Sequence, residues 1–159
     1  MPFPIPELTL NNDLALPFRF GVFFFAGGVI PNPLDIRFQK VSGLSASVET
    51  TPHPEGGQNL YTQKLPTSIS YPNLTLERGM VVGSLLNVEL NAVLSTFKFA
   101  PSNIIVTLFA SDKVPLAGWL FLNAWPVKWS TSDLDANEKS KPVIDTMELT
   151  YNRMQILRV

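Results

Sequence analysis

One histidine is the residue of this chain best suited to acid–base chemistry. His53 stands between two prolines in the segment TTPHPEGGQN (50–59) and is the only histidine. A serine–histidine–aspartate triad would have to use it, and loops often carry catalytic groups. No segment near it resembles a nucleophile elbow, so a surface loop histidine is the stronger interpretation. A hydrolase that uses His53 as its catalytic base stays open as one functional hypothesis.

The acidic residues give no clear pattern for a metal or a catalytic pair. Asp133, Asp135 and Glu138 resemble a calcium loop only superficially, because the glycine and the spacing of an EF-hand are absent. A solvated polar loop fits them better. A glycosidase pair would have to come from scattered carboxylates, and nothing marks two of them as special. There is no phosphate-binding glycine loop and no dinucleotide fingerprint. The sequence therefore predicts no catalytic residue, no metal site and no cofactor.

Two of the three tryptophans stand close together in NAWPVKW (123–129). Trp125 and Trp129 flank Pro126, and with Tyr61 they could form a stacking platform for a sugar. A carbohydrate-binding β-sandwich is therefore the alternative function. The stronger interpretation is a strand corner whose tryptophans pack into the core or against a neighbouring subunit, since buried aromatic contact is the common fate of tryptophan.

The composition favours a single domain that assembles with other subunits. The chain has 159 residues, a net charge of -1 and a mean hydropathy of +0.15. Charged residues make up 16% of it, against about 25% in an average soluble protein. So few charges suggest a large buried interface and therefore an oligomer. The balanced charge predicts no nucleic-acid specificity.

The absence of cysteine and of long apolar runs narrows the cellular setting. Without cysteine the chain has no disulfide, iron–sulfur or thiol chemistry, which favours folding in a reducing cytoplasm. The apolar runs fall short of the ~20 residues of a membrane helix, so no direct membrane insertion is expected. The first residues do not read as a conventional signal peptide.

The pattern of the chain predicts an antiparallel β-barrel or sandwich with one flanking helix. Residues 1–17, with four prolines, are expected to form an extended N-terminal arm, and residues 18–159 a single β domain. Breaker-rich loops are expected at 26–34 and 50–59, and Pro72 should place its strand at an edge or at a bulge. Ser84 is the expected N-cap of the helix, over 83–97. Period-two alternation indicates strands at 18–25, 36–39, 44–48, 59–65, 68–78, 103–110, 114–125, 143–151 and 154–159.

Several of these segments, in this order, resemble one known family. The chain is similar to the tail tube proteins of contractile phages and of phage-tail-like extracellular contractile injection systems, which include the antifeeding prophage and the Photorhabdus virulence cassettes. The resemblance spans residues 18–151. The segments that carry it are FRFGVFF, DIRFQKVSGLSASVET, HPEGGQN, KLP, YPNLTLERGM, NAWPVKWSTSDLDAN and VIDTMELTY.

The resemblance implies a structural protein and not an enzyme. Its fold would be an antiparallel barrel or sandwich, six copies would form a ring, and rings would stack into a hollow tube inside a contractile sheath. Expected partners are the chain itself, tube paralogues, sheath, spike hub and baseplate proteins. The helix and the loops at 26–34 and 50–59 are expected to make contacts between rings. The residues expected to serve structure or assembly are Arg78, Gly79, Trp125, Pro126 and Trp129.

Two roles within such a particle stay open. The chain is either the bulk tube protein or the subunit of a first ring that joins the tube to the trimeric spike hub. Two departures from common tube subunits bear on the choice. The helix region ends in VLSTF, with Phe97 where a tryptophan is common nearby, and the proline-rich arm is long enough to reach the hub or baseplate.

Overall fold

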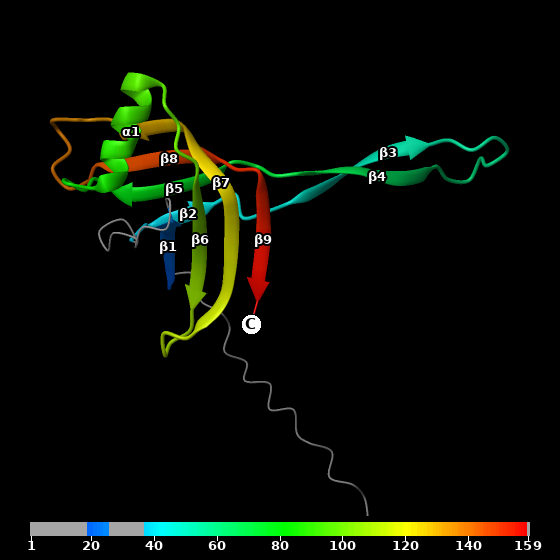
Figure 1. The fold of residues 1–159 in the computed structure, drawn as a ribbon, viewed down its shortest axis with the longest axis horizontal. Coiled ribbons are helices and arrows are strands. Elements are labelled where there is room, and N and C mark those ends of the chain that lie inside the picture. Colours follow the sequence, from blue (N-terminus) through cyan, green and yellow to red (C-terminus); the bar gives the residue numbers. More distant parts are fainter. Residues whose placement is uncertain (1–18, 26–36, 159) are drawn as a thin grey trace, which may run out of the picture.

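The computed structural model describes residues 19–25 and 37–158, which form nine strands and one helix (Figure 1). All strand pairs are antiparallel, so the expected mainly-β antiparallel fold with one helix is confirmed. The N-terminal arm (1–17) and the loop at 26–34 lie outside the described residues. The elements are β1 (Phe20–Phe25), β2 (Lys40–Ser42), β3 (Ser47–His53), β4 (Gln63–Ser70), β5 (Leu74–Gly79), α1 (Leu85–Thr96), β6 (Ser102–Phe109), β7 (Pro115–Thr131), β8 (Ile144–Thr150) and β9 (Arg153–Arg158).

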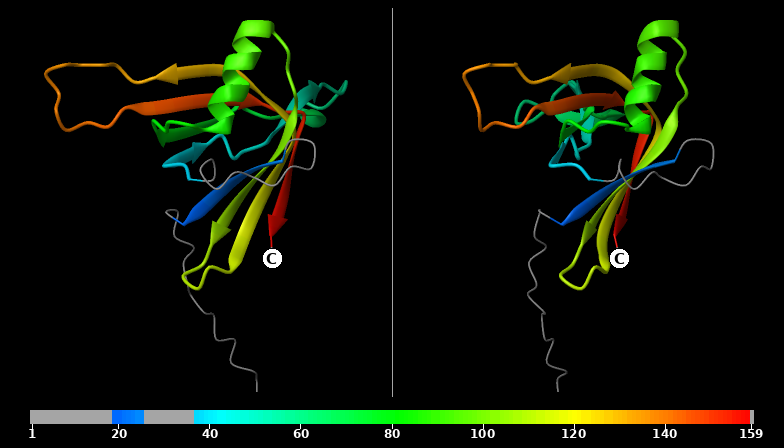
Figure 2. Two further views of the ribbon diagram at one scale, coloured as in Figure 1. Left: turned by 60° about the vertical axis from the view of Figure 1, so that its left-hand side comes forward. Right: turned by 90° about the vertical axis from the view of Figure 1, so that its left-hand side faces the viewer.

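The long strand β7 joins two sheets, because its two halves pair with different neighbours. Residues 115–124 pair mainly with β6 and β9, and β1 lies beyond β6. Residues 125–131 pair with β8, beyond which lie β5 and β2. Asn123 has a positive φ of 53°, and the register with β8 shifts between Pro126 and Lys128. Such irregularities bend a strand, and Figure 2 shows β7 turning from one sheet into the other.

One hydrophobic cluster spans both sheets and the helix. Its inward side chains follow the period of two that a strand imposes, as in β5, where Leu74 and Leu76 are fully buried. Each such buried side chain contributes roughly 1.5–3 kcal/mol relative to exposure. The cluster holds Val22, Phe38, Leu74, Leu76, Leu86, Leu90, Ile104, Val106, Phe121, Ala124, Met147, Leu149, Tyr151 and Met154.

The helix α1 lies over the second sheet and ends in a left-handed residue. Phe97 has a φ of 53°, and its N–H donates to the carbonyl of Val93 at 2.9 Å. Ser84 occupies the predicted N-cap position, but its side chain makes no capping bond, which corrects the expectation. Its Oγ instead accepts a hydrogen bond from Arg78 at 2.8 Å. Leaving a buried, charged guanidinium without an acceptor costs more free energy than leaving the N-terminus of a helix without a side-chain cap.

Two loop expectations were wrong. Strand β3 continues to His53, so the expected loop at 50–59 starts later, and the next strand, β4, begins only at Gln63. Pro72 does not interrupt a strand, because it lies in the connection between β4 and β5. Strand β3 contains a proline, Pro52. Proline is tolerated there because both strands of a two-stranded ribbon are edge strands, on which one side of the backbone needs no partner.

Candidate assembly surfaces

A groove between α1 and the second half of β7 is lined by apolar side chains. It has a volume of about 290 Å³. Phe97 is 83% exposed, Leu94 70% and Trp129 40%. Phe97 packs edge-on against Phe99, with ring centroids 5.0 Å apart, and Phe99 packs against Trp125 at 5.2 Å. Contiguous exposed apolar surface of this kind marks an interaction site in a soluble protein.

The bend of β7 sets the positions of the predicted tryptophan corner. Pro126 pairs with Leu149 of β8 and lies beneath α1, where its ring lines a second small cavity with Met147. Trp125 is half-buried against Phe99, whereas Trp129 is more open to solvent. The two indoles therefore do not form one exposed stacking platform, and the region is an aromatic wall of the groove.

Arg78 is buried at the junction of β5 and α1, with 3% of its surface exposed. Its Nη2 donates to Ser84 Oγ at 2.8 Å and to Asn87 Oδ1 at 3.0 Å, and its guanidinium lies 5.5 Å from the ring centroid of Phe38. Asn87 in turn donates to the carbonyl of Val81 at 3.2 Å. Arg78 thus connects β5 to the start of α1. Gly79 is the last residue of β5.

The long hairpin (residues 47–70) projects away from the rest of the fold (Figure 1). Its two strands pair only with each other, and almost every residue in them is exposed. Val48 lies opposite Ile69, and Leu65 lies opposite Thr51. The register shifts between Glu49 and Thr50, where β4 carries one extra residue, so Leu65 and Ile69 lie on opposite faces of the hairpin. The hairpin therefore carries uncovered apolar side chains on both faces.

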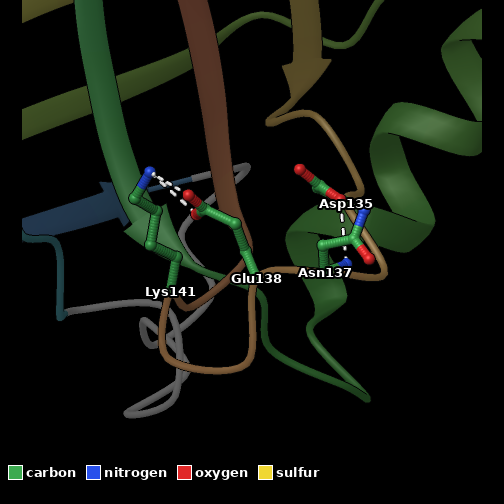
Figure 3. A network of polar contacts seen from close by, with 4 residues as sticks. All are labelled: Asp135, Asn137, Glu138 and Lys141. Atoms are coloured by element: carbon green, nitrogen blue, oxygen red, sulfur yellow. Dashed lines mark hydrogen bonds and ion pairs between the residues drawn. The ribbon is translucent and has the colours of Figure 1, made fainter.

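The polar loop at 132–143 is held by contacts within itself, at the end of the molecule opposite the long hairpin (Figures 1 and 3). Asp135 Oδ1 accepts from the backbone N–H of Asn137 at 2.9 Å, and Glu138 forms an ion pair with Lys141 at 2.7 Å. These are contacts of a solvated loop, as the sequence predicts. Within the described ranges no group of three or more acidic or histidine side chains could hold a metal ion.

His53 lies at the outer end of β3, where it pairs with Gln63 and is exposed. A two-stranded ribbon in solvent gives an imidazole no enclosed site that could exclude water or orient a substrate. No helix in the described part of the chain is both long and apolar enough to cross a membrane.

One residue of note, Asp145, was missed by the sequence analysis. It is 4% exposed and stands opposite Arg78 in the β5–β8 ladder. The signal was present in VIDTMELTY, where Asp145 shares the inward period of Met147 and Leu149. An acidic residue at an apolar period position indicates a buried carboxylate.

Comparison with known proteins agrees with this geometry. The family of the T4-like virus tail tube protein gp19 matches residues 16–155. The chain is 36% identical to a chain in the cryo-EM structure of the anti-feeding prophage baseplate, six-fold symmetrised, with a TM-score of 0.83 over 91% of this chain and 96% of that one.

Two further structures share the fold. One is a chain of the sheath–tube complex of an extracellular contractile injection system, PVC, in the extended state, at 23% identity and a TM-score of 0.75 over 91% of each chain. The other is a chain of the anti-feeding prophage cap, which terminates the tube, at 22% identity and a TM-score of 0.75 over 100% of this chain and 94% of that one. A search of curated proteins finds no significant match.

Proposed function

Because the chain belongs to the T4-like virus tail tube protein family, we propose that it forms a six-fold ring at the baseplate end of the inner tube of a contractile injection apparatus. In this proposal residues 18–159 are one tube domain and residues 1–17 an arm that reaches toward the hub or baseplate. The role is structural, and the ring initiates the tube on the spike.

The observation that carries the proposal is a difference in identity within one particle. The chain is 36% identical to a chain in the anti-feeding prophage baseplate structure, which was symmetrised as six-fold, but 22% identical to a chain in the cap of the same system. The PVC sheath–tube chain stands at 23%. All three share the fold, so the higher identity favours the baseplate end over the bulk tube and the cap.

The free edges of the first sheet support a ring. Among the described strands, β1 and β9 bound this sheet, and each pairs on one side only. A head-to-tail contact, in which β9 of one copy pairs with β1 of the next, satisfies both edges and closes when the rotation between copies is 60°. Ile156 and Leu157 of β9 are about half exposed, which is expected of residues that a neighbour covers.

The exposed apolar surfaces support further partners. The groove beside α1 and the exposed apolar side chains of the long hairpin lie in different parts of the subunit (Figure 1), so one ring contact does not cover both. We assign them to contacts with neighbouring copies of the chain, with tube paralogues and with sheath, spike hub and baseplate proteins, and we place assembly in the bacterial cytoplasm. In this scheme Trp125, Pro126 and Trp129 are assembly residues, while Arg78 and Gly79 hold α1 and β5 in place.

Electron microscopy of the full chain, alone and with the proteins encoded beside it, tests the proposal. The expected result is no long tube from the chain alone and one six-fold ring captured on a spike complex. Long stacked tubes from the chain alone would identify the bulk tube protein and overturn the baseplate assignment. A monomer in both preparations would overturn the structural role as well.

A further inference from the structure

Asp145 carries a buried carboxylate oxygen that has no partner in the described part of the chain. Its Oδ1 accepts a hydrogen bond from Thr131 Oγ1 at 3.0 Å, whereas its Oδ2 is fully buried and has no hydrogen-bond partner. A buried unsatisfied oxygen costs about 1–3 kcal/mol, and more when it is charged. Such a group in a native structure calls for an explanation, and a donor from outside the described residues would supply one.

A cavity of about 310 Å³ is lined in part by Asp145, and a group from another chain could reach Asp145 through it. It lies between the 80–83 turn, α1 and the end of β7. Its rim is apolar and open, since Met80 is 53% exposed and Val82 92%. Asn87, which also lines it, is already engaged by Arg78 and by the carbonyl of Val81. Asp145 is the one ionisable residue among those that line the cavity, so its carboxylate is the group that would attract a cationic donor.

The position of this cavity in the fold suggests the source of the donor. Its lining comes from the end of β7, the start of β8 and the 80–83 turn, which lie at the end of the molecule away from the long hairpin (Figure 1). The hairpin of the same copy cannot reach it. In a ring of identical copies joined head to tail, one end of each subunit meets the opposite end of the next.

Lys64 is the only lysine or arginine between residues 47 and 70. It is exposed and stands one residue pair from the outer end of the paired strands, opposite Pro52. The apolar stem of a lysine can lie along an apolar rim while its ammonium group reaches a polar partner. Its charge and its three donors match the unpartnered oxygen of Asp145.

We propose that the cavity beside Asp145 receives Lys64 from the long hairpin of a neighbouring copy, and that this contact locks adjacent subunits of the ring. The inference rests on the proposed ring. It deepens that function by naming one contact on which assembly depends. The buried ion pair forms only in the assembled state, so its strength appears in assembly and not in the folding of a single subunit.

The test is a double-mutant cycle on assembly of the full chain, alone and with its spike and baseplate partners. Asp145→Asn keeps the shape and the Thr131 bond but removes the charge, and Lys64→Met keeps the stem. Each single change should raise the protein concentration at half-assembly at least about tenfold. The double variant should be no worse than the weaker-assembling single variant, because coupled partners are not additive. Sedimentation velocity and electron microscopy provide the measurement.

Asp133→Asn and Lys139→Met are the matched controls, because both residues are exposed in the polar loop and should leave assembly unchanged. Wild-type assembly by Asp145→Asn or by Lys64→Met would overturn the inference, and so would two fully additive losses. If Asp145→Asn fails to fold, Lys64→Met decides alone, since Lys64 is far from the core. Absence of rings from the unmutated chain would instead overturn the proposed function, so the two failures are distinguishable.

Discussion

Strands β5 and β8 of the body and strands β3 and β4 of the long hairpin all carry apolar residues, but the burial of these residues is opposite. In β5 and β8 every second residue is buried, including Leu76, which has no exposed surface. In the hairpin Val48 is 59% exposed and Ile69 58%. The body strands have neighbours on both sides and α1 above them, whereas the hairpin strands have only each other.

This difference agrees with the proposal that the hairpin contacts another chain. A two-stranded hairpin alone is marginally stable in water, because it has no face to bury. The long hairpin nevertheless keeps exposed apolar residues, where a solvated ribbon would be expected to carry polar ones. A partner that covers these side chains would therefore stabilise the hairpin.

The largest expected effect comes from the body. Leu76→Ala removes a fully buried side chain and should lower the free energy of unfolding by ~2–5 kcal/mol. Leu65→Ala, the same change on the hairpin, should lower it by less than about 0.5 kcal/mol, as for an exposed site. Urea denaturation of the isolated subunits measures both. Equal losses would break the distinction between body and hairpin.

Much of the body could be predicted from the sequence because its burial is decided by local alternation. The β6–β7 hairpin and the last two strands were placed correctly, since glycine, proline and polar residues bound them. The bend of β7 could not be predicted. Pro126 argues against a central strand, and only the register shift beside it explains how β7 continues to Thr131.

The next effect concerns the boundary between body and assembly surface. Trp125 is half-buried against Phe99, so Trp125→Ala should cost roughly 2 kcal/mol, about half of the ~3–5 kcal/mol of a fully buried aromatic ring. Trp129→Ala is the control, because its ring is more open to solvent and should cost less. Thermal unfolding gives the ranking, and a reversed order would show that the assignment of the two rings is wrong.

The hairpin and the candidate site were harder to predict, for a physical reason. Which apolar residues stay exposed in one chain depends on the partner, and the partner is not encoded in local periodicity. The segment 50–59 has the composition of a loop, and strand β3 enters it because pairing with β4 outweighs its low β-propensity. Asp145 was overlooked because buried carboxylates are rare enough to be read as surface residues.

A smaller effect on folding, with a large one on assembly, is expected from the hairpin. The double change Leu65→Ser and Ile69→Ser removes an exposed apolar side chain from each face of the hairpin but leaves the strand pairing. The unfolding free energy of the single subunit should change by less than about 1 kcal/mol. Ring formation on the spike complex should be lost, as measured by electron microscopy. Rings that form normally would show that these two side chains are exposed to solvent in the assembled particle, as they are in the single subunit.

The smallest effect lies where the body meets the base of the hairpin. Tyr151 packs against Phe121 and against Tyr71, which follows β4, and its hydroxyl is buried without a hydrogen-bond partner. Burial raises the pKa of Tyr151 above its ordinary value of 10.0, and the neighbouring Tyr71 raises it further. The folded state thus favours the neutral phenol. This contribution is complete below pH 10 and is lost as the pH rises through the folded-state pKa.

Tyr151→Phe keeps the ring contacts and removes the unpartnered hydroxyl. At pH 7 the variant should be as stable as the unmutated chain or more stable by up to about 1 kcal/mol. Between pH 9 and pH 12 it should lose less stability, because one raised pKa is gone. Melting temperatures across this range test both points, with Tyr61→Phe on the exposed hairpin loop as the control. An unchanged alkaline slope would show that the Tyr151 hydroxyl reaches solvent, and that the body is open at the base of the hairpin.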